Sequence, residues 1–510
     1  MRDWRLLSTI NGGHKRSVRC VGWKDYGSRH TSKRLKQGAG RDYNGEDDDE
    51  GDGVAAEKRD PVILATGSFD ANVGLWVWNR DYGKRSAGDK LTSIPGGFGD
   101  DDDIEQDFTD DRAGGDGEEE DEEWHFSTLL TGPDSEIKDL QFSPAHYGAN
   151  LLAMCSRDKS VWVWEEVEPE EWETIAVLGE HTGDVKCVRW LEGVRTSRRQ
   201  IRDRLRQRRQ RRLQQEKDQD TEMSDDQDAA TENGDEEEII LAHRELLATS
   251  SYDDTIRLHH DDEAEGDWMC IAVLTGHDGT VWDLKFEPHL NLSSYPAATT
   301  AEEVIVDWAP RLLSCSDDTT IRLWRKELNA HEKDKKSAAI SAARQGSIGS
   351  NGPRQQTRQT GFAGSLLPSS IRVGTSTEIW AEDARLPQVH VRSIYAIDWS
   401  VQTGLIVSCG GDGIIAVYRE EPASQADISM NGTSEEEGVE IKKIATEWKV
   451  VAMIEGAHDE YEINHVCWAS RRDMKSSDES GVGGEYIVST GDDGDVRVWE
   501  LPGGILGENE

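Results

Sequence analysis

The segment SDDTTIRLW, residues Ser316–Trp324, indicates a repeat fold because variants of it occur five more times along the chain. Each variant places an Asp in a polar turn and follows it with a short apolar segment that ends on Trp, Tyr or His. The six copies are Ser68–Trp76, Ser156–Trp164, Ser251–His259, Ser316–Trp324, Gly410–Tyr418 and Asp492–Trp499. Self-similarity of this kind indicates a repeat architecture.

Two further features flank most copies of this stretch. Upstream, a β-branched residue stands five positions before an aromatic residue, as Val281 stands before Phe286. Downstream, a fourth strand usually opens with an acid and a Trp, as at Asp267 and Trp268. Four short strands per unit with a Trp-Asp type signature predict the blade of a WD-repeat β-propeller. The predicted fold class is therefore all-β, with six repeats visible.

The repeats divide the whole chain, residues 1–510, into one propeller. The expected blades cover approximately residues 14–132, 133–178, 179–274, 275–386, 387–454 and 455–500. The last repeat ends at Trp499 after three strands, so we expect residues 4–10 to supply its outer strand. Pairing the two ends of the chain in this way would cover two exposed sheet edges.

Seven insertions lengthen the repeats beyond the usual unit of about 40 residues. They cover approximately residues 24–60, 79–122, 192–244, 289–309, 325–377, 419–445 and 469–484. Each lies between the first and second or the third and fourth strands, and in an antiparallel blade both connections emerge on one face. We therefore expect long, disordered, largely acidic insertions on one face of the propeller and short turns on the other.

Two insertions have a distinctive composition. The arginine run Arg195–Arg212 predicts a solvated charged helix, stabilised by side-chain pairs four residues apart. A role of this run in nucleic-acid binding or nuclear import is the less favoured alternative. The segment Ser337–Arg358 is rich in Ser, Ala, Gly and Gln and predicts a disordered linker.

The net charge of the chain limits the classes of molecule that it can bind. It has 58 Lys and Arg against 101 Asp and Glu, a formal net charge of −43. This negative field disfavours direct binding to nucleic acid. No stretch reaches the roughly 18 apolar residues of a membrane span, and the first residues lack a secretory signal. We expect a cytoplasmic protein that can also be nuclear, with no membrane contact.

The polar residues of the fourth repeat predict a structural tetrad. His277, Ser314, Asp318 and Trp324 stand where WD repeats form an internal hydrogen-bonded chain. A His beside an Asp also suggests a catalytic pair, but the turn Asp recurs in all six repeats. We therefore predict no catalytic residue and no enzyme. The 7 cysteines show no CxxC spacing and follow the blade pattern, so neither a metal nor a cofactor is expected.

The residue before each turn Asp should point toward solvent on the short-turn face. These six residues are Phe69, Arg157, Tyr252, Asp317, Gly411 and Asp492. Arg157 is the one cation among them, and arginine with neighbouring aromatic residues is typical of a protein-binding hot spot. Arg157, Phe69 and Tyr252 are thus the predicted partner-binding residues. An equally weighted alternative is that Arg157 only pairs with a nearby acid such as Asp253.

Several stretches are more specific than the repeat itself, notably CSRDKSVWVWE (Cys155–Glu165), HTGDVKCVRW (His181–Trp190) and LTGHDGTVWDLKF (Leu274–Phe286). Through them the chain resembles the fungal-type WD-repeat propeller of the cytosolic iron-sulfur protein assembly (CIA) targeting complex. The resemblance implies a non-enzymatic scaffold that helps to target and insert Fe-S clusters into cytosolic and nuclear apoproteins. It also implies that Arg157 is a surface contact.

The partners implied by the resemblance are a HEAT-repeat adaptor, a small cluster-targeting protein and apo iron-sulfur client proteins. The family has seven blades, so this chain is expected to lack the first blade and to begin at its outer strand; the less favoured alternative is that the long insertions conceal a further repeat. The alternative function is that of a WD-repeat scaffold in a chromatin or ubiquitin-ligase complex. Acidic insertions would suit a chromatin role because they attract basic histones.

Overall fold

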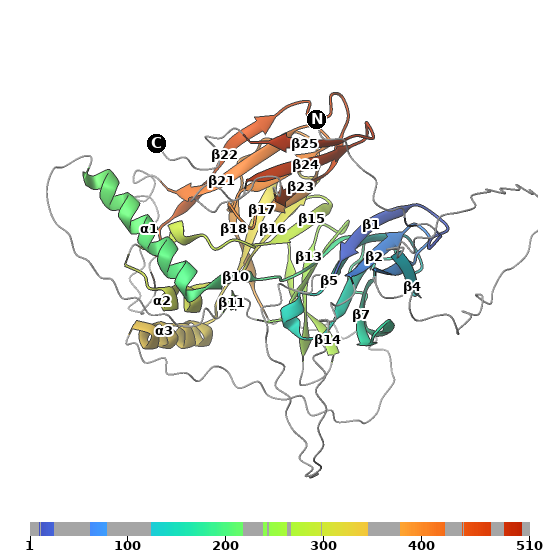
Figure 1. Cartoon of the computed structure of the whole chain (residues 1–510), viewed down its shortest axis with the longest axis horizontal. Helices are drawn as coiled ribbons and strands as arrows, with labels where there is room; N and C mark the ends of the chain where they lie inside the picture. The colour runs from blue at the N-terminus through green and yellow to red at the C-terminus, as the bar shows by residue number, and fades with distance from the viewer. Residues whose placement is uncertain are drawn as a thin grey trace, which may run out of the picture.

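The computed structural model describes residues 10, 12–24, 62–78, 124–217, 238–241, 244–262, 267–296, 298–344, 378–423, 441, 443–470 and 484–501. The strands of these residues form six antiparallel sheets that follow one another along the chain, and a separate two-stranded hairpin (Figure 1). The protein is a WD-repeat β-propeller, as the repeats predict, with six blades in this part of the chain. The seventh blade implied by the resemblance is not among the described residues.

The first strand of each blade lies innermost and contacts the first strand of the next blade. These inner strands are β1 (Val18–Trp23), β5 (Ile137–Phe142), β9 (Val185–Trp190), β15 (Val281–Phe286), β19 (Ile394–Trp399) and β23 (Ile463–Ser470). Side-chain carboxylates of one inner strand accept hydrogen bonds from backbone N–H groups of its neighbour. The bonds run from Val188 to Asp139 (3.2 Å), from Ile397 to Asp283 (3.2 Å) and from Trp468 to Asp398 (2.8 Å).

The remaining strands follow outward in each blade. They are β2 (Val62–Ser68), β3 (Val73–Trp78) and β4 (Trp124–Leu130); β6 (Leu151–Ser156), β7 (Val161–Glu168) and β8 (Glu171–Leu178); β12 (Leu247–Ser251), β13 (Ile256–Asp262) and β14 (Asp267–Leu274); β16 (Arg311–Ser316), β17 (Ile321–Lys326) and β18 (Trp380–Arg385); β20 (Ile406–Gly410), β21 (Ile415–Pro422) and β22 (Thr446–Ile454); and β24 (Glu485–Gly491) and β25 (Val496–Glu500). The sixth sheet thus has three strands among the described residues. Residues 1–9 lie outside them, so the pairing of residues 4–10 with the last blade stays a prediction.

Every inner strand pairs with its neighbour through a register shift at its second residue. A bulge of this kind leaves one residue without a partner in the ladder and redirects its side chain. The six redirected residues, which we call the bulge ring, are Arg19, Lys138, Lys186, Trp282, Tyr395 and Asn464. They lie at the end of each inner strand that faces the short turns.

The short turn between the second and third strands is built alike in all six blades. In blade 4 the backbone N–H of Asp318 donates to Ser316 Oγ, and that of Thr320 donates to Asp318 Oδ1 (3.1 and 2.9 Å). The residue after the turn Asp has a left-handed backbone in every blade; these residues are Ala71, Lys159, Asp254, Thr319, Gly413 and Gly494. Only two are glycine, so the other four keep a conformation that side chains disfavour. The Asp and Ser hydrogen bonds hold it in place.

The described parts of the insertions form a second small core beside the propeller. They contain the hairpin β10 (Val194–Ser197) and β11 (Glu238–Leu241), the single turn η3 (Leu292–Ser294), and the helices α1 (Arg198–Lys217), α2 (Ala301–Asp307) and α3 (Ala330–Arg344). A further single turn, η2 (Ala145–Tyr147), lies between β5 and β6. Figure 1 shows α1, α2, α3 and the hairpin gathered on one side of the blades. Val194, Ile201, Leu241, Val304 and Trp308 are buried together between them.

This arrangement corrects one prediction and refines another. Residues 337–344 were expected to belong to a disordered linker, but they form the second half of α3, in which Ile340 is buried. Alanine-rich stretches favour helix once one face can pack. The arginine run forms a helix, α1, from Arg198 onward, while its first three residues belong to β10. Ile201 on α1 is fully buried, so the helix is anchored and not entirely solvated.

Candidate functional site

The residues before the six turn Asp residues, which we call the turn ring, share one backbone arrangement. Each N–H donates to a carbonyl just before the inner strand of its blade. The bonds join Phe69 to Ser17 (3.0 Å), Arg157 to Glu136 (3.0 Å), Tyr252 to Asp184 (2.8 Å), Asp317 to Thr280 (3.0 Å), Gly411 to Ser393 (2.9 Å) and Asp492 to Glu462 (3.0 Å). The backbone is therefore fixed while the side chains differ. The bulge ring and the turn ring together define the short-turn face.

The tetrad of blade 4 lies directly beneath this face. His277 Nδ1 is 2.8 Å from Asp318 Oδ2, and its Nε2 is 2.8 Å from Ser314 Oγ. Trp324 Nε1 donates to the same Ser314 oxygen at 2.8 Å. Burial alone would raise the pKa of Asp318, but hydrogen bonds from His277 and Thr320 outweigh it and hold that pKa well below its usual range. A carboxylate stabilised in this way is a poor proton acceptor.

The same His–Asp contact recurs in four other blades. The pairs are His14–Asp70 (3.2 Å), His181–Asp253 (3.0 Å), His390–Asp412 (3.1 Å) and His458–Asp493 (2.8 Å). Blade 2 differs, because Pro133 stands where the other blades have His. There Asp158 accepts a hydrogen bond from the backbone N–H of Asp134 (2.7 Å). The His–Asp pairs thus hold the turns in place, so their role is structural.

Two of the predicted partner-binding residues project into solvent. The side chain of Arg157 is 62% exposed and Tyr252 is 62% exposed, whereas Phe69 is half-buried beneath the guanidinium of Arg19. The alternative for Arg157 was pairing with a nearby acid such as Asp253, but Asp253 is bound by His181. The acid near Arg157 is Asp184, with Nε and Oδ2 separated by 4.0 Å. An exposed contact of that length stabilises little.

The bulge ring contributes residues that the sequence reasoning missed. Lys186 Nζ lies 5.6 Å from the ring centroid of Tyr252 and 4.9 Å from that of Trp282. It also lies 3.5 Å from Asp184, the carboxylate that faces Arg157. Arg157 and Tyr252 therefore belong to one cluster, while Phe69 belongs to a separate contact in blade 1. In the sequence these residues share one position, directly after the β-branched start of each inner strand, but the bulge that turns their side chains toward the short turns is visible only in the structure.

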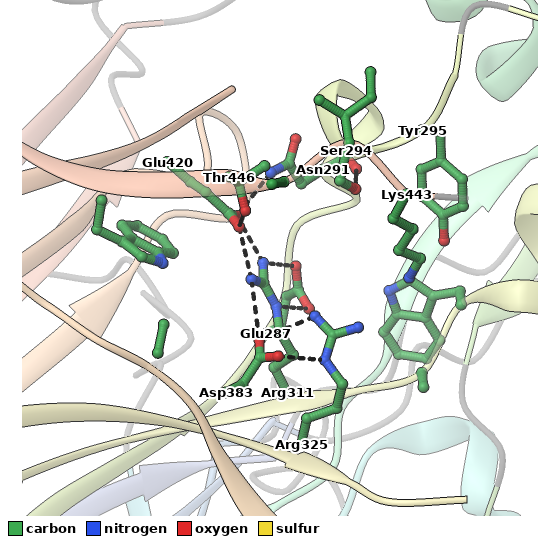
Figure 2. A pocket seen from close by; sticks show the side chains of 16 residues that line it. Glu287, Asn291, Ser294, Tyr295, Arg311, Arg325, Asp383, Glu420, Lys443 and Thr446 are labelled. Atoms are coloured by element: carbon green, nitrogen blue, oxygen red, sulfur yellow. Dashed lines mark hydrogen bonds and ion pairs between the residues drawn. The ribbon is translucent and has the colours of Figure 1, made fainter. Parts of the chain in front are cut away.

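A cavity of about 390 Å³ lies between blades 4 and 5 on the insertion side (Figure 2). At its base Arg311 binds Glu287 (2.7 and 2.9 Å) and Glu420 (2.8 and 2.9 Å). Arg325 pairs with Asp383 at 3.0 Å on the rim. The guanidinium of Arg311 is therefore hydrogen-bonded by Glu287 and Glu420. This buried ion network at the base of the cavity joins blades 4 and 5.

The cysteines are placed as packing residues. Cys155, Cys187, Cys315 and Cys409 are free thiols buried in the strands, and burial raises the pKa of each well above its ordinary value. Such thiols stay protonated, whereas a metal ligand must be a thiolate. In the part of the chain that the structure describes, no three His, Cys, Asp or Glu side chains are grouped to hold a metal ion. No described helix is long and apolar enough to cross a membrane.

Comparison with known proteins supports this architecture. The family model for the WD domain, G-beta repeat, matches residues 268–325, 385–419 and 448–500. These segments contain strands of the fourth, fifth and sixth blades and the outer strand of the third. The family model therefore agrees with the sheets in the structure.

Three fungal proteins are similar over nearly the full chain, and each is called a probable cytosolic iron-sulfur protein assembly protein 1. The protein of Botryotinia fuckeliana is 34% identical over 98% of this chain and 87% of its own length. That of Neurospora crassa is 32% identical over 97% and 86%, and that of Sclerotinia sclerotiorum 36% over 98% and 86%. At this identity and coverage, the chain belongs to the cytosolic iron-sulfur protein assembly protein 1 family.

Proposed function

We propose that this protein is a non-enzymatic scaffold of the cytosolic iron-sulfur protein assembly machinery. In this role it helps to target and insert Fe-S clusters into cytosolic and nuclear apoproteins through protein–protein contacts, with the cluster as cargo. The names of the similar fungal proteins support the pathway. We place the protein in the cytoplasm and, for nuclear clients, in the nucleus.

The observation that carries the proposal is the construction of the short-turn face. Six turns share one backbone arrangement, and the side chains at their tips differ from blade to blade. Arg157 and Tyr252 extend from this rigid frame into solvent, and such pre-ordered side chains lose little entropy when a partner binds. The His–Asp pairs that could suggest catalysis are occupied with each other and with Ser or Thr of their own blades. Binding is what this arrangement is suited to do.

The proposed partners are a HEAT-repeat adaptor, a small cluster-targeting protein and apo iron-sulfur clients. Affinity capture of the full chain from a fungal extract, followed by mass spectrometry, tests this directly. We expect it to recover a HEAT-repeat protein and iron-sulfur enzymes. Recovery of only chromatin or ubiquitin-ligase subunits would replace the proposal with its alternative.

A matched pair of variants locates the contact. Arg157→Glu should reduce capture because it reverses the charge of an exposed tip on the short-turn face. Lys449→Glu is the control, since Lys449 is half-exposed on the outer strand β22, away from the short turns. Equal capture by both variants would show that the partners bind elsewhere on the protein.

A further inference from the structure

The short-turn face is divided into two halves of opposite charge. In blades 1–3 the bulge ring consists of Arg19, Lys138 and Lys186, and in blades 4–6 of Trp282, Tyr395 and Asn464. The turn ring changes in the same way, from Phe69, Arg157 and Tyr252 to Asp317, Gly411 and Asp492. Every cation of the two rings therefore lies in blades 1–3, and both acids lie in blades 4–6.

Neighbouring loops follow the division in part. The exposed Asp278 and the half-exposed Glu462 extend the acidic half. Asp134, Glu136, Asp184 and Asp254 are acids within the basic half, where Glu136 and Asp184 contact Lys138 and Lys186. Arg392 is a cation of the acidic half, and its guanidinium lies 3.9 Å from Glu462.

Charges within each half act on one another across blade boundaries. Burial lowers the pKa of Lys186, Asp184 opposes that shift, and Lys138 and Arg19 add to it. Burial raises the pKa of Tyr395 to about 12, and Glu462, Asp317 and Asp492 all contribute in the same direction. Like charges on different blades thus produce a common field on each half of the face.

Aromatic side chains from three blades form a seam where the halves meet. Lys186 lies against Tyr252 and Trp282, and Trp282 meets Tyr395 edge-on with centroids 5.4 Å apart. Polar contacts hold the far side of the seam. Trp282 Nε1 donates to Asp317 (2.5 Å), and the Tyr395 hydroxyl donates to Glu462 (2.9 Å). These rings are therefore pre-ordered, and Tyr252 offers an exposed apolar surface next to Arg157.

We propose that the short-turn face binds a polypeptide segment of mixed charge in a single orientation. Acidic residues of the segment lie over blades 1–3, apolar residues on the Tyr252–Trp282 seam, and basic residues over blades 4–6. This inference rests on the proposed scaffold function and specifies the chemistry of one partner. A nucleic acid is uniformly negative and would be repelled by Asp278, Asp317 and Asp492, so the two-signed face favours a polypeptide.

Labelled synthetic peptides test the polarity on the full chain. The block peptide has Glu at one end, Leu and Phe in the middle and Lys at the other end. The alternating peptide has the same composition with the charges interspersed, and duplex DNA is a third probe. By fluorescence anisotropy we expect the block peptide to bind about ten-fold more tightly than the alternating one. Equal affinity of the two peptides, or tighter binding of DNA, would overturn the proposal.

Charge reversal determines the orientation. Arg19→Glu with Arg157→Glu, or Asp278→Lys with Asp492→Lys, should each weaken block-peptide binding about ten-fold, because each reverses one half. All four substitutions together should restore binding with the peptide turned around. A photo-cross-linker at the Glu end should then move from blades 1–3 to blades 4–6, and unchanged cross-links would contradict the model. Unchanged thermal midpoints check that the variants fold.

The capture experiment keeps the two proposals separable. If the wild-type chain recovers iron-sulfur proteins but the peptide order has no effect, the scaffold function stands and the polarity is wrong. If the peptides behave as expected but no iron-sulfur protein is recovered, the binding face stands and the assignment to the assembly pathway fails.

Discussion

The two faces of the propeller differ in how their connections between strands are built. On the short-turn face all six connections have one backbone design, in which the turn Asp accepts a backbone hydrogen bond around a left-handed residue. In blades 1–4 a Ser hydroxyl accepts a second backbone hydrogen bond. On the insertion face the connections differ in length, and their described parts add helices, a hairpin and a second core (Figure 1). Invariant backbone leaves the side chains free to specialise for binding, whereas the insertion face contributes packing and ion pairs of its own.

The largest expected difference between the faces concerns arginine removal. Arg311→Met should lower the free energy of unfolding by about 3–5 kcal/mol, because it leaves the buried carboxylates of Glu287 and Glu420 without a cation. Arg157→Met on the short-turn face should change it by less than about 0.5 kcal/mol. Urea unfolding of the full chain measures both.

The triple variant Arg311→Met, Glu287→Gln, Glu420→Gln is the control for buried charge. Burial would raise the pKa of Glu420, but the hydrogen bonds and charge of Arg311 lower it to about 2. Neutral amides no longer need the cation, so the triple variant should regain most of the lost stability. If Arg311→Met costs less than about 1 kcal/mol, the network does not join the blades as described.

A second comparison concerns blades with and without a tetrad histidine. Asp318→Ala should cost about 2–3 kcal/mol, because His277 and the turn lose a charge-assisted acceptor. Asp158→Ala in blade 2 should cost less, about 1–2 kcal/mol, since no His contacts Asp158 there. Thermal unfolding compares the two variants. Equal losses would show that the turn, and not the His–Asp bond, supplies the stability.

A third prediction uses pH to examine blade 3, where His259 stands in place of the tetrad Trp. Burial, with smaller contributions from His181 and Arg257, lowers the pKa of His259 from 6.5 to about 3. The unfolded chain therefore binds a proton below pH 6.5 that the folded chain does not, so stability falls as the pH drops from 6.5 toward 3. At pH 5 this amounts to about 2 kcal/mol.

His259→Trp should remove that part of the pH dependence by restoring the residue found at the same position in four other blades. Denaturant unfolding at pH 7.5 and pH 5 gives the difference for the wild type and the variant. If both lose the same stability on acidification, His259 is not the group responsible. Acid loss below pH 4 should remain, because the lowered pKa values of the turn Asp residues act there.

Most of the fold could be predicted because the same sequence pattern occurs six times. The turn Asp, the closing aromatic residue and the β-branched start of each inner strand give the blades and the side on which insertions leave them. Residues 337–344 were mistaken for linker because their Ser and Ala show no helical pattern in the sequence, whereas in the fold α3 contacts α2 and Ile340 is buried. The small core of the insertions is likewise assembled from residues far apart in the sequence, such as Val194 and Trp308.

The candidate site could be predicted only in part. Arg157 and Tyr252 were found because each occupies a repeated position where the neighbouring copies differ. Lys186 was missed because it becomes notable only once a bulge turns it toward Tyr252 and Trp282, residues of other strands. Likewise, the sequence offered Asp253 as an example of an acid near Arg157, but the Asp253 carboxylate is bound by His181 and the acid near Arg157 is Asp184.

The smallest expected effect on stability is that of Arg157→Glu, and it sharpens the comparison most. The substitution removes only a 4.0 Å contact with Asp184 and adds a charge at a largely exposed tip, so the free energy of unfolding should change by less than about 0.5 kcal/mol. Urea unfolding at pH 7.5 measures this next to the capture experiment. Weakened capture with unchanged stability would separate binding from folding on this face. A loss of 2 kcal/mol or more would instead place Arg157 with Arg311, among the residues that hold the blades together.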